Sequence, residues 1–305
     1  MFERLFAESG LSLDRLRALV EVGAAGSMVR AAGGDPARQS QYSRQIKELE
    51  DFFQTGLVER HGKGIRLTAS GRELARISRF FLLGLSNFQG GCRAEGQTYR
   101  IGASPTFIAS FLLPVLAEPR SVESGIRFAI EAALGDDVER RLHDLTLDFG
   151  VVTRAELSRP LQLKELGAWR LRFWVPKALC KTVRQAERAL GDKRLPLVWP
   201  AGELPQSEFN FLDDYEPALT CSNFLEARVA LEEKSLAAFL PDFVPLGSMT
   251  DQCWELKVPA VDACLFHYRL VWNPRLLRLN PHAQRRRDAL IEALAQKLTH
   301  PCAVT

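Results

Sequence analysis

Apolar residues recur every three to four positions along the first part of the chain, and this spacing predicts amphipathic helices. A first helix is predicted between Ser12 and Gly26, because serine favours the start of a helix and glycine the position after its end. Its apolar face consists of Leu13, Leu16, Leu19 and Val20. Ser27 can cap a short second helix over residues 28–33, which Gly34 ends.

A third helix is predicted over residues 36–53, with Asp35 as its cap and Pro36 as its first residue. Its apolar side chains share an arc of about 60° and are Tyr42, Ile46, Leu49 and Phe53. A separate arc carries amides, hydroxyls and cations, from Gln39, Ser40, Ser43, Arg44 and Lys47. Such groups suit base edges and phosphates in a major groove, although a solvated helix face has the same pattern. The short helix and turn before it favour DNA reading, because two helices joined in this way form a DNA-binding unit.

Two short apolar runs after this helix, at residues 57–58 and 65–67, predict a β-hairpin whose turn contains two glycines. Arg60, Lys63 and Arg66 place positive charge on the hairpin. This is the expected layout of a wing that touches the DNA backbone or the minor groove.

A long helix capped by Thr68 is predicted over residues 69–88. It carries an apolar stripe at spacings of three and four, formed by Leu74, Ile77, Phe81, Leu85 and Phe88. A partner subunit would bury this stripe by coiled-coil packing, and packing within the same chain is the alternative. Gly90-Gly91 and the residues up to 96 are expected to form a linker.

These elements resemble, in order and spacing, the winged helix-turn-helix of LysR-type transcriptional regulators. The matching stretches are SMVRAA (27–32), QSQYSRQIKELE (39–50), LVER (57–60) and KGIRLTASG (63–71). The resemblance implies DNA contacts from the third helix and the wing, through Gln39, Ser40, Ser43, Arg44, Lys63 and Arg66. This module departs from the family's pattern in three places: Asp35 stands where a buried leucine is usual, residues 36–38 replace a small apolar residue and a Ser or Thr cap, and Gln54 stands where a glycine usually precedes the wing.

Strand-like and helix-like segments alternate in two sets through the rest of the chain, which predicts two α/β lobes with mostly parallel sheets. The apolar run 265–272 is expected to return the chain to the first lobe, where the last helix, 283–298, packs. The stretches RIGASPTFIASFLLPVL (100–116) and LAAFLPDFV (236–244) resemble the effector-binding domain of LysR-type regulators, which is itself similar to a periplasmic binding protein.

This resemblance implies a small effector held between the lobes, near strand ends and helix starts. The candidate contacts are hydroxyl residues at such positions: Ser104, Thr106, Thr153, Thr220 and Ser222. An anionic effector is favoured, because the start of a helix attracts negative charge. Each of these hydroxyls can equally be a helix cap, and the sequence leaves that alternative open.

Charge and composition agree with this division of the chain. Residues 1–96 contain 14 basic and 11 acidic residues, whereas the remainder contains 26 of each kind, so the net charge of +3 lies in the N-terminal third. The six cysteines and five histidines are scattered, and we expect neither a metal site nor a cofactor. The chain shows no signal peptide and no apolar run long enough to span a membrane, which predicts a cytoplasmic protein.

The expected fold is α/β with an N-terminal module rich in α-helix. Its parts are a winged helix-turn-helix (1–68), a linker and dimerisation helix with a hinge (69–96), and a two-lobed effector-binding domain (97–305), with lobes at about 97–160 plus 267–305 and at about 161–266. The expected function is that of a homodimeric or homotetrameric regulator that binds double-stranded DNA and a small molecule. No nucleotide-binding, nucleophile-elbow or zinc-protease motif occurs. An enzyme or a solute-binding protein is the alternative, and neither explains the helix-turn-helix and wing.

Overall fold

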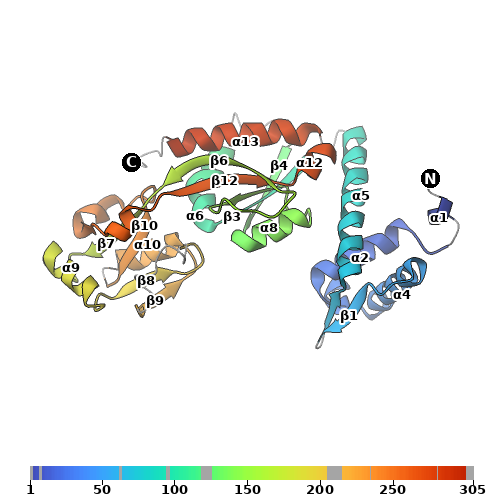
Figure 1. Cartoon of the computed structure of the whole chain (residues 1–305), viewed down its shortest axis with the longest axis horizontal. Helices are drawn as coiled ribbons and strands as arrows, with labels where there is room; N and C mark the ends of the chain where they lie inside the picture. Colours follow the sequence, from blue (N-terminus) through green and yellow to red (C-terminus); the bar gives the residue numbers. More distant parts are fainter. Residues whose placement is uncertain are drawn as a thin grey trace. The chain divides into compact units, whose positions relative to one another are not determined.

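The computed structural model describes residues 3–6, 9–61, 64–93, 97–117, 126–204, 215–233, 235–279 and 281–299. The chain divides into two compact units, residues 1–95 and 96–305, which are described one at a time (Figure 1). The first unit is helical with one β-hairpin, and the second contains two five-stranded sheets.

The N-terminal unit is a three-helix module followed by a hairpin and a long helix. Its elements are α1 (Glu3–Phe6), α2 (Leu13–Ala25), α3 (Met28–Ala31), α4 (Pro36–Phe53), β1 (Val58–His61), β2 (Gly64–Leu67) and α5 (Ala69–Arg93). Ser12, Ser27 and Asp35 cap α2, α3 and α4, and each side chain accepts a backbone N–H of the first turn. These helix starts were predicted from the sequence and are confirmed.

The apolar face of α4 packs on α2 and orients the rest of the module. Its buried residues are Tyr42, Ile46 and Leu49, with Phe53 partly buried. The Tyr42 hydroxyl donates a hydrogen bond to Glu21 of α2, and this bond together with burial raises the pKa of Tyr42. The Glu50 carboxylate accepts the N–H groups of Leu57 and Val58, at 2.7 and 3.1 Å, and so fixes the hairpin against α4.

The turns on either side of α4 use left-handed backbone. Gly33 and Gly34, with φ of 64° and 84°, form the turn between α3 and α4, where a side chain would be strained. Gln54, with φ of 49°, takes the left-handed conformation at the end of α4 that a glycine adopts more easily. The departures from the family's pattern around α4 therefore change side chains without abolishing the helix-turn-helix.

Helix α5 is longer than the sequence predicted. Thr68 caps it by accepting the Gly71 N–H at 3.0 Å, as expected. The helix then continues to Arg93 and includes Gly90-Gly91, which were predicted to begin a linker. Glycine weakens a helix by only about 1 kcal/mol per residue relative to alanine, so two glycines near the end of a long helix do not have to stop it.

The C-terminal unit contains the strands and helices of both lobes. They are β3 (Gln97–Ala103), α6 (Pro105–Phe107), η1 (Ile108–Leu112), α7 (Leu113–Ala117), β4 (Ile126–Ala132), α8 (Gly135–His143), β5 (Phe149–Val152), β6 (Gln162–Trp169), β7 (Leu171–Pro176), α9 (Val183–Gly191), β8 (Leu197–Pro200), β9 (Leu219–Cys221), α10 (Phe224–Glu232), β10 (Ala237–Pro241), η5 (Gly247–Gln252), β11 (Cys253–Leu256), α11 (Pro259–Asp262), β12 (Phe266–Trp272), α12 (Pro274–Leu279) and α13 (Pro281–Thr299).

Each lobe is built on a mixed sheet in which four of the five strands run in one direction, so the sheets are mostly parallel, as predicted. The strand orders are β4-β3-β5-β12-β6 in the first lobe and β11-β7-β10-β8-β9 in the second. Strand β3 is parallel to β4 and β5, and β8 is parallel to β9 and β10. Only β12 in the first sheet and β7 in the second run against the other strands, because β12 is antiparallel to both β5 and β6 and β7 is antiparallel to both β10 and β11. Each of these two strands is the first strand after a crossover between the lobes.

The crossovers lie close together at the junction of the lobes. Because β6 belongs to the first sheet, the chain passes to the second lobe at Arg170, beyond the expected boundary at 161. It returns through the segment between β11 and β12, so the predicted return at residues 265–272 is confirmed. The Arg170 guanidinium donates to the carbonyl of Asp262 in that segment at 3.1 Å, and the Arg170 carbonyl accepts the Asp242 N–H at 2.8 Å.

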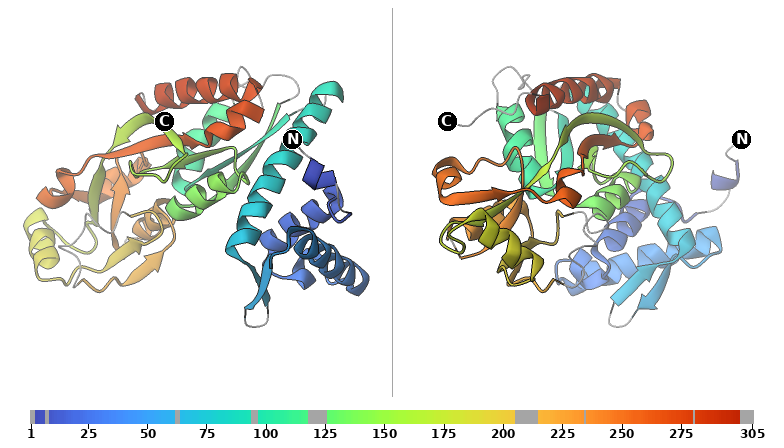
Figure 2. Two further views of the ribbon diagram at one scale, coloured as in Figure 1. Left: turned by 45° about the vertical axis from the view of Figure 1, so that its right-hand side comes forward. Right: turned by 60° about the vertical axis from the view of Figure 1, so that its left-hand side comes forward.

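Helices cover both faces of the first sheet. Val138 and Leu142 of α8 pack with Val152 on one face. Val151, the preceding residue of the same strand, faces the opposite core, which α13 and the continuous helical stretch 105–117 complete. Figures 1 and 2 show α13 lying along this sheet, as predicted for the last helix.

Candidate functional sites

The polar arc of α4 faces solvent along the length of the helix. Its five predicted DNA-contacting residues, Gln39, Ser40, Ser43, Arg44 and Lys47, are all exposed. Among the residues that the structure describes, no carboxylate pairs with Arg44 or Lys47. An exposed row of amides, hydroxyls and uncompensated cations suits a polyanionic partner with hydrogen-bonding edges.

Three arginines on other faces of the module are instead neutralised by neighbouring carboxylates. The pairs are Arg15 with Glu48, Arg17 with Asp14 and Glu21, and Arg76 with Glu73. Within α4, Arg38, Arg44 and Lys47 have no carboxylate partner among the described residues, so this helix keeps uncompensated positive charge. Such a local excess attracts nucleic acid even though the net charge of the whole chain is small.

The predicted wing is a two-stranded hairpin. Strands β1 and β2 pair antiparallel from Val58 opposite Leu67 to His61 opposite Gly64. Arg60 and Arg66 are exposed on it, and Glu59 stands opposite Arg66 in the register. Lys63, the other predicted wing contact, lies outside the described residues.

The stripe on α5 is largely uncovered within this chain. Ile77, Phe81, Leu85 and Phe88 are 51%, 47%, 42% and 73% exposed, whereas Leu74 is partly buried against the helix-turn-helix module. Large side chains in a continuous row on one helix face rarely stay in water, so the row is a candidate subunit interface.

A cavity lies between the lobes of the C-terminal unit. It holds about 180 Å³ of space open to water-sized molecules, close to the ~150 Å³ of a cavity known to bind benzene. Its wall is mostly apolar or aromatic, from Ala133, Leu134, Gly135, Val151, Val152, Trp169, Gly202, Leu204, Phe224 and Tyr268. The remaining wall residues are Ser104, Thr153, Arg154 and Glu203. Burial, followed by the nearby charges of Glu203 and Asp242, raises the pKa of Tyr268 well above its usual value.

Ser104 and Thr153 lie where they were predicted, in the wall of the cavity, but Thr106 does not. Thr106 is fully buried, and its N–H donates to Glu203 Oε1 at 2.9 Å. The Thr106 hydroxyl donates to Glu203 Oε2, which also accepts the Phe224 N–H at 2.9 Å. The expectation that Thr106 is free to hold a ligand is therefore wrong for this structure, because Glu203 takes both donors.

Thr220 and Ser222 also lie outside the wall of the cavity, which corrects a second expectation. Both side chains are exposed, and Asn223 rather than either hydroxyl caps α10 by accepting the Glu226 N–H at 3.0 Å. The Ser222 N–H is bound by the Glu226 carboxylate at 2.7 Å. Glycine-free polar segments before a helix contain several possible caps, and the sequence alone does not rank them.

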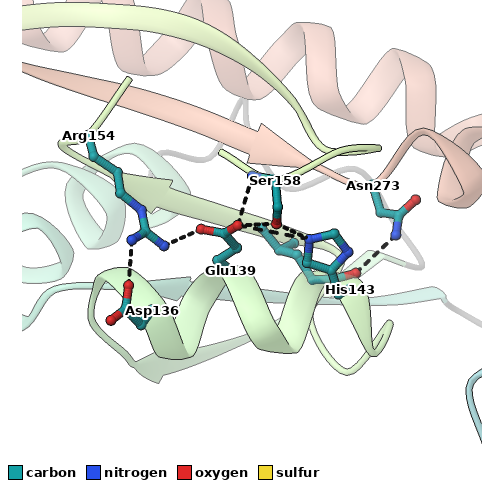
Figure 3. A network of polar contacts seen from close by, with 7 residues as sticks. Asp136, Glu139, His143, Arg154, Ser158 and Asn273 are labelled. Carbon is teal, nitrogen blue, oxygen red and sulfur yellow. Dashed lines mark hydrogen bonds and ion pairs between the residues drawn. The ribbon is translucent and has the colours of Figure 1, made fainter. Parts of the chain in front are cut away.

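Arg154 contributes the positive charge of the cavity wall, and acidic side chains of α8 hold it (Figure 3). Its guanidinium pairs with Asp136 and with Glu139. Burial opposes ionisation of Glu139, but hydrogen bonds from Ser158 and the charges of Arg154 and His143 lower its pKa overall. Arg154 is thus compensated within its own lobe before any ligand binds.

Figure 3 also shows a serine, a histidine and a carboxylate in contact, and their geometry is not that of a nucleophile and its base. The Ser158 hydroxyl donates to Glu139, while His143 Nε2 lies 2.7 Å from Ser158 Oγ and 3.9 Å from Glu139 Oε1. The carboxylate thus binds the hydroxyl directly instead of orienting the far nitrogen of the imidazole. The cluster ties the segment after β5 to α8.

Family comparisons cover both units. Residues 13–72 match the bacterial regulatory helix-turn-helix protein family of lysR type, and residues 93–295 match the LysR substrate binding domain. The chain belongs to the LysR family of bacterial transcriptional regulators. It is therefore a LysR-type regulator with a DNA-binding module and a substrate-binding domain, as the resemblance implied.

Individual relatives of this LysR-type regulator are distant in sequence. The transcriptional regulator HdfR of Yersinia pestis (strain Pestoides F) is 26% identical over 240 residues, which span 76% of this chain and 82% of HdfR. Full-length LysG of Corynebacterium glutamicum, solved with bound effector Arg, has a TM-score of 0.65 at 17% identity and covers 94% of this chain and 99% of its own. Full-length CbnR, complexed with its target DNA, has a TM-score of 0.51 at 17% identity, with 90% and 100% covered.

The described part of this LysR-type regulator contains neither a membrane-spanning helix nor a cluster of metal ligands. No helix there is long and apolar enough to cross a membrane. No three metal-binding side chains gather there, and the described cysteines, Cys180, Cys221, Cys253 and Cys264, form no disulfide.

Proposed function

We propose that this regulator reads double-stranded DNA with the exposed face of α4 and contacts phosphates with the wing. The uncompensated cations and exposed amides of α4 carry the proposal, because no carboxylate among the described residues pairs with Arg44 or Lys47. Gln39 and Arg44 suit paired hydrogen bonds to adenine and guanine, Ser40 and Ser43 suit single bonds, and Lys47, Lys63 and Arg66 suit phosphates. The DNA-bound CbnR of the same fold supports this use of the module.

The exposed stripe of α5 is the proposed dimer interface. A second copy of this helix would present the same apolar row and cover it symmetrically. Two copies would also supply two reading helices for two half-sites of an operator, as helix-turn-helix dimers do.

The cavity between the lobes is the proposed binding place for a small-molecule effector, with Ser104 and Thr153 among its contacts. Its size, its aromatic wall and its few polar groups are those of a small-molecule site. The effector-bound LysG of similar fold supports a ligand response. We infer further that the protein is a regulator without catalytic activity, since the cavity wall offers no nucleophile held by a base.

Selection of bound DNA tests this proposal. Purified protein is mixed with sheared genomic DNA of its host, and bound fragments are recovered and sequenced at several salt concentrations. We expect a recurrent site with two related half-sites. Recovery of fragments in proportion to their abundance, with no recurrent site, would refute sequence-specific reading. Lys63→Ala in the wing should weaken binding to all sequences alike and reduce the slope of log affinity against log salt by about 0.9 per lost phosphate contact.

A further inference from the structure

The Glu203 carboxylate occupies hydrogen-bond donors at two helix starts between the lobes. It comes from the turn after β8 in the second lobe, and it accepts three hydrogen bonds. Two come from Thr106 in the first turn of the helical stretch 105–117 of the first lobe, and one from Phe224 at the start of α10. Backbone N–H groups at helix starts and a hydroxyl are the donors that proteins use for carboxylates.

These bonds also join the lobes. Thr106 belongs to the first lobe, and Glu203 and Phe224 belong to the second, so one carboxylate links helix starts on both sides of the cavity. Thr106 is fully buried and Phe224 is 1% exposed, so water does not compete easily for these donors.

The rest of the wall leaves little for a charged ligand. Arg154 is paired with Asp136 and Glu139 of its own lobe, and Glu203 is satisfied by three donors. The remaining surface is dominated by Trp169, Phe224 and Tyr268 with aliphatic neighbours. Most of this wall is therefore apolar, which suits an uncharged ligand.

We propose that Glu203 is a built-in occupant of the carboxylate position between the lobes, and that the cavity beside it takes an uncharged ligand of about the size of one aromatic ring. This inference rests on the proposed use of the cavity as the effector site. It replaces the anionic effector favoured by the sequence, because an incoming carboxylate would have to displace Glu203 and would meet its negative charge.

Isosteric probes of different charge test the inference on the full-length protein. Benzyl alcohol, benzoate and benzylamine are added to wild type, Glu203→Ala and Glu203→Gln, and melting temperatures are compared with those in sodium chloride of the same ionic strength. We expect benzyl alcohol to raise the wild-type melting temperature, by about 4 °C at ten times its Kd, with no response to benzoate or benzylamine. Glu203→Ala vacates the three donors and should gain a saturable response to benzoate and to acetate.

Two further variants show whether the gained benzoate response comes from the vacated volume or from the loss of the negative charge. Glu203→Gln fills the same volume without the charge and should not gain the benzoate response. Adding Thr106→Val to Glu203→Ala removes one freed donor and should weaken the gained response at least tenfold in Kd. A wild-type response to benzoate or benzylamine that equals the benzyl alcohol response would overturn the inference, and so would a folded Glu203→Ala protein that ignores both carboxylates.

Hydrogen exchange gives a test that needs no variant. The Thr106 and Phe224 amides should be protected in the ligand-free wild type, and rapid exchange at both would contradict a resident carboxylate. Operator binding is measured on the same samples. If the wild type binds operator DNA but benzyl alcohol does not raise its melting temperature, this inference is wrong. If the wild type does not bind operator DNA, the proposed function is wrong.

Discussion

The apolar stripe on α5 allows the sharpest quantitative prediction about assembly. Ile77, Phe81, Leu85 and Phe88 are each about half exposed or more. Full burial of such a side chain contributes ~1.5–3 kcal/mol, so covering the exposed part contributes ~1 kcal/mol each and ~8 kcal/mol over two chains. Association itself costs at least ~4 kcal/mol. The net free energy of dimerisation is therefore small, and the loss of one apolar side chain from the stripe should weaken the dimer measurably.

Phe81→Asp removes ~2 kcal/mol of this burial over the two chains and places two carboxylates in the seam. The dimer should therefore weaken by at least 100-fold, which sedimentation velocity over a range of protein concentrations would measure. Ser86→Asp is the matched control, because Ser86 is exposed on the same helix but lies away from the stripe. At protein concentrations low enough to dissociate the wild-type dimer, both variants should have the melting temperature of the wild type. If Phe81→Asp sediments as the wild type does at every concentration, α5 is not the interface.

Two smaller changes test the structure inside each unit. Gly71→Ala would place a Cβ 2.0 Å from the Leu57 carbonyl oxygen and should lower the melting temperature and operator affinity, with a loss of ~1–3 kcal/mol, whereas Gly56→Ala, which meets nothing within 4 Å, should not. Glu139→Gln should be less stable than wild type at pH 7. Because the folded pKa of Glu139 is lowered, that difference should vanish in melting curves as the pH falls below ~4, and a constant difference would contradict this assignment.

Sequence patterns predicted the N-terminal module well because its signals are local. Asp35 and Pro36 identify the start of α4 through capping chemistry, and the period of Tyr42, Ile46 and Leu49 identifies its buried face. The sequence could not predict that Arg44 has no carboxylate partner among the described residues, because ion pairing depends on which carboxylates the fold brings near.

The second unit shows where sequence information was insufficient. Strand β6 has mostly exposed polar residues at the edge of its sheet, so it lacked the apolar run used to identify strands. Glu203 was missed because its partners, Thr106 and Phe224, lie far away in sequence. The only local signal was an acidic residue in the turn after β8, where carboxyl ends of strands gather. Ser104 caps α6 and lines the cavity, whereas Ser222 does neither, and only the fold separates the two hydroxyls.

DNA titration of α4 variants tests the central claim most directly. Operator and random duplexes are titrated with wild type, Gln39→Ala, Ser43→Ala and Arg44→Ala. Arg17→Ala serves as the control, since Arg17 is also exposed but is paired with Asp14 and Glu21. We expect Arg44→Ala and Gln39→Ala to lose ~1–3 kcal/mol of discrimination, or about 5- to 150-fold in operator preference, while Arg17→Ala matches wild type. Unchanged operator affinity in all three α4 variants would show that α4 is not the reading helix.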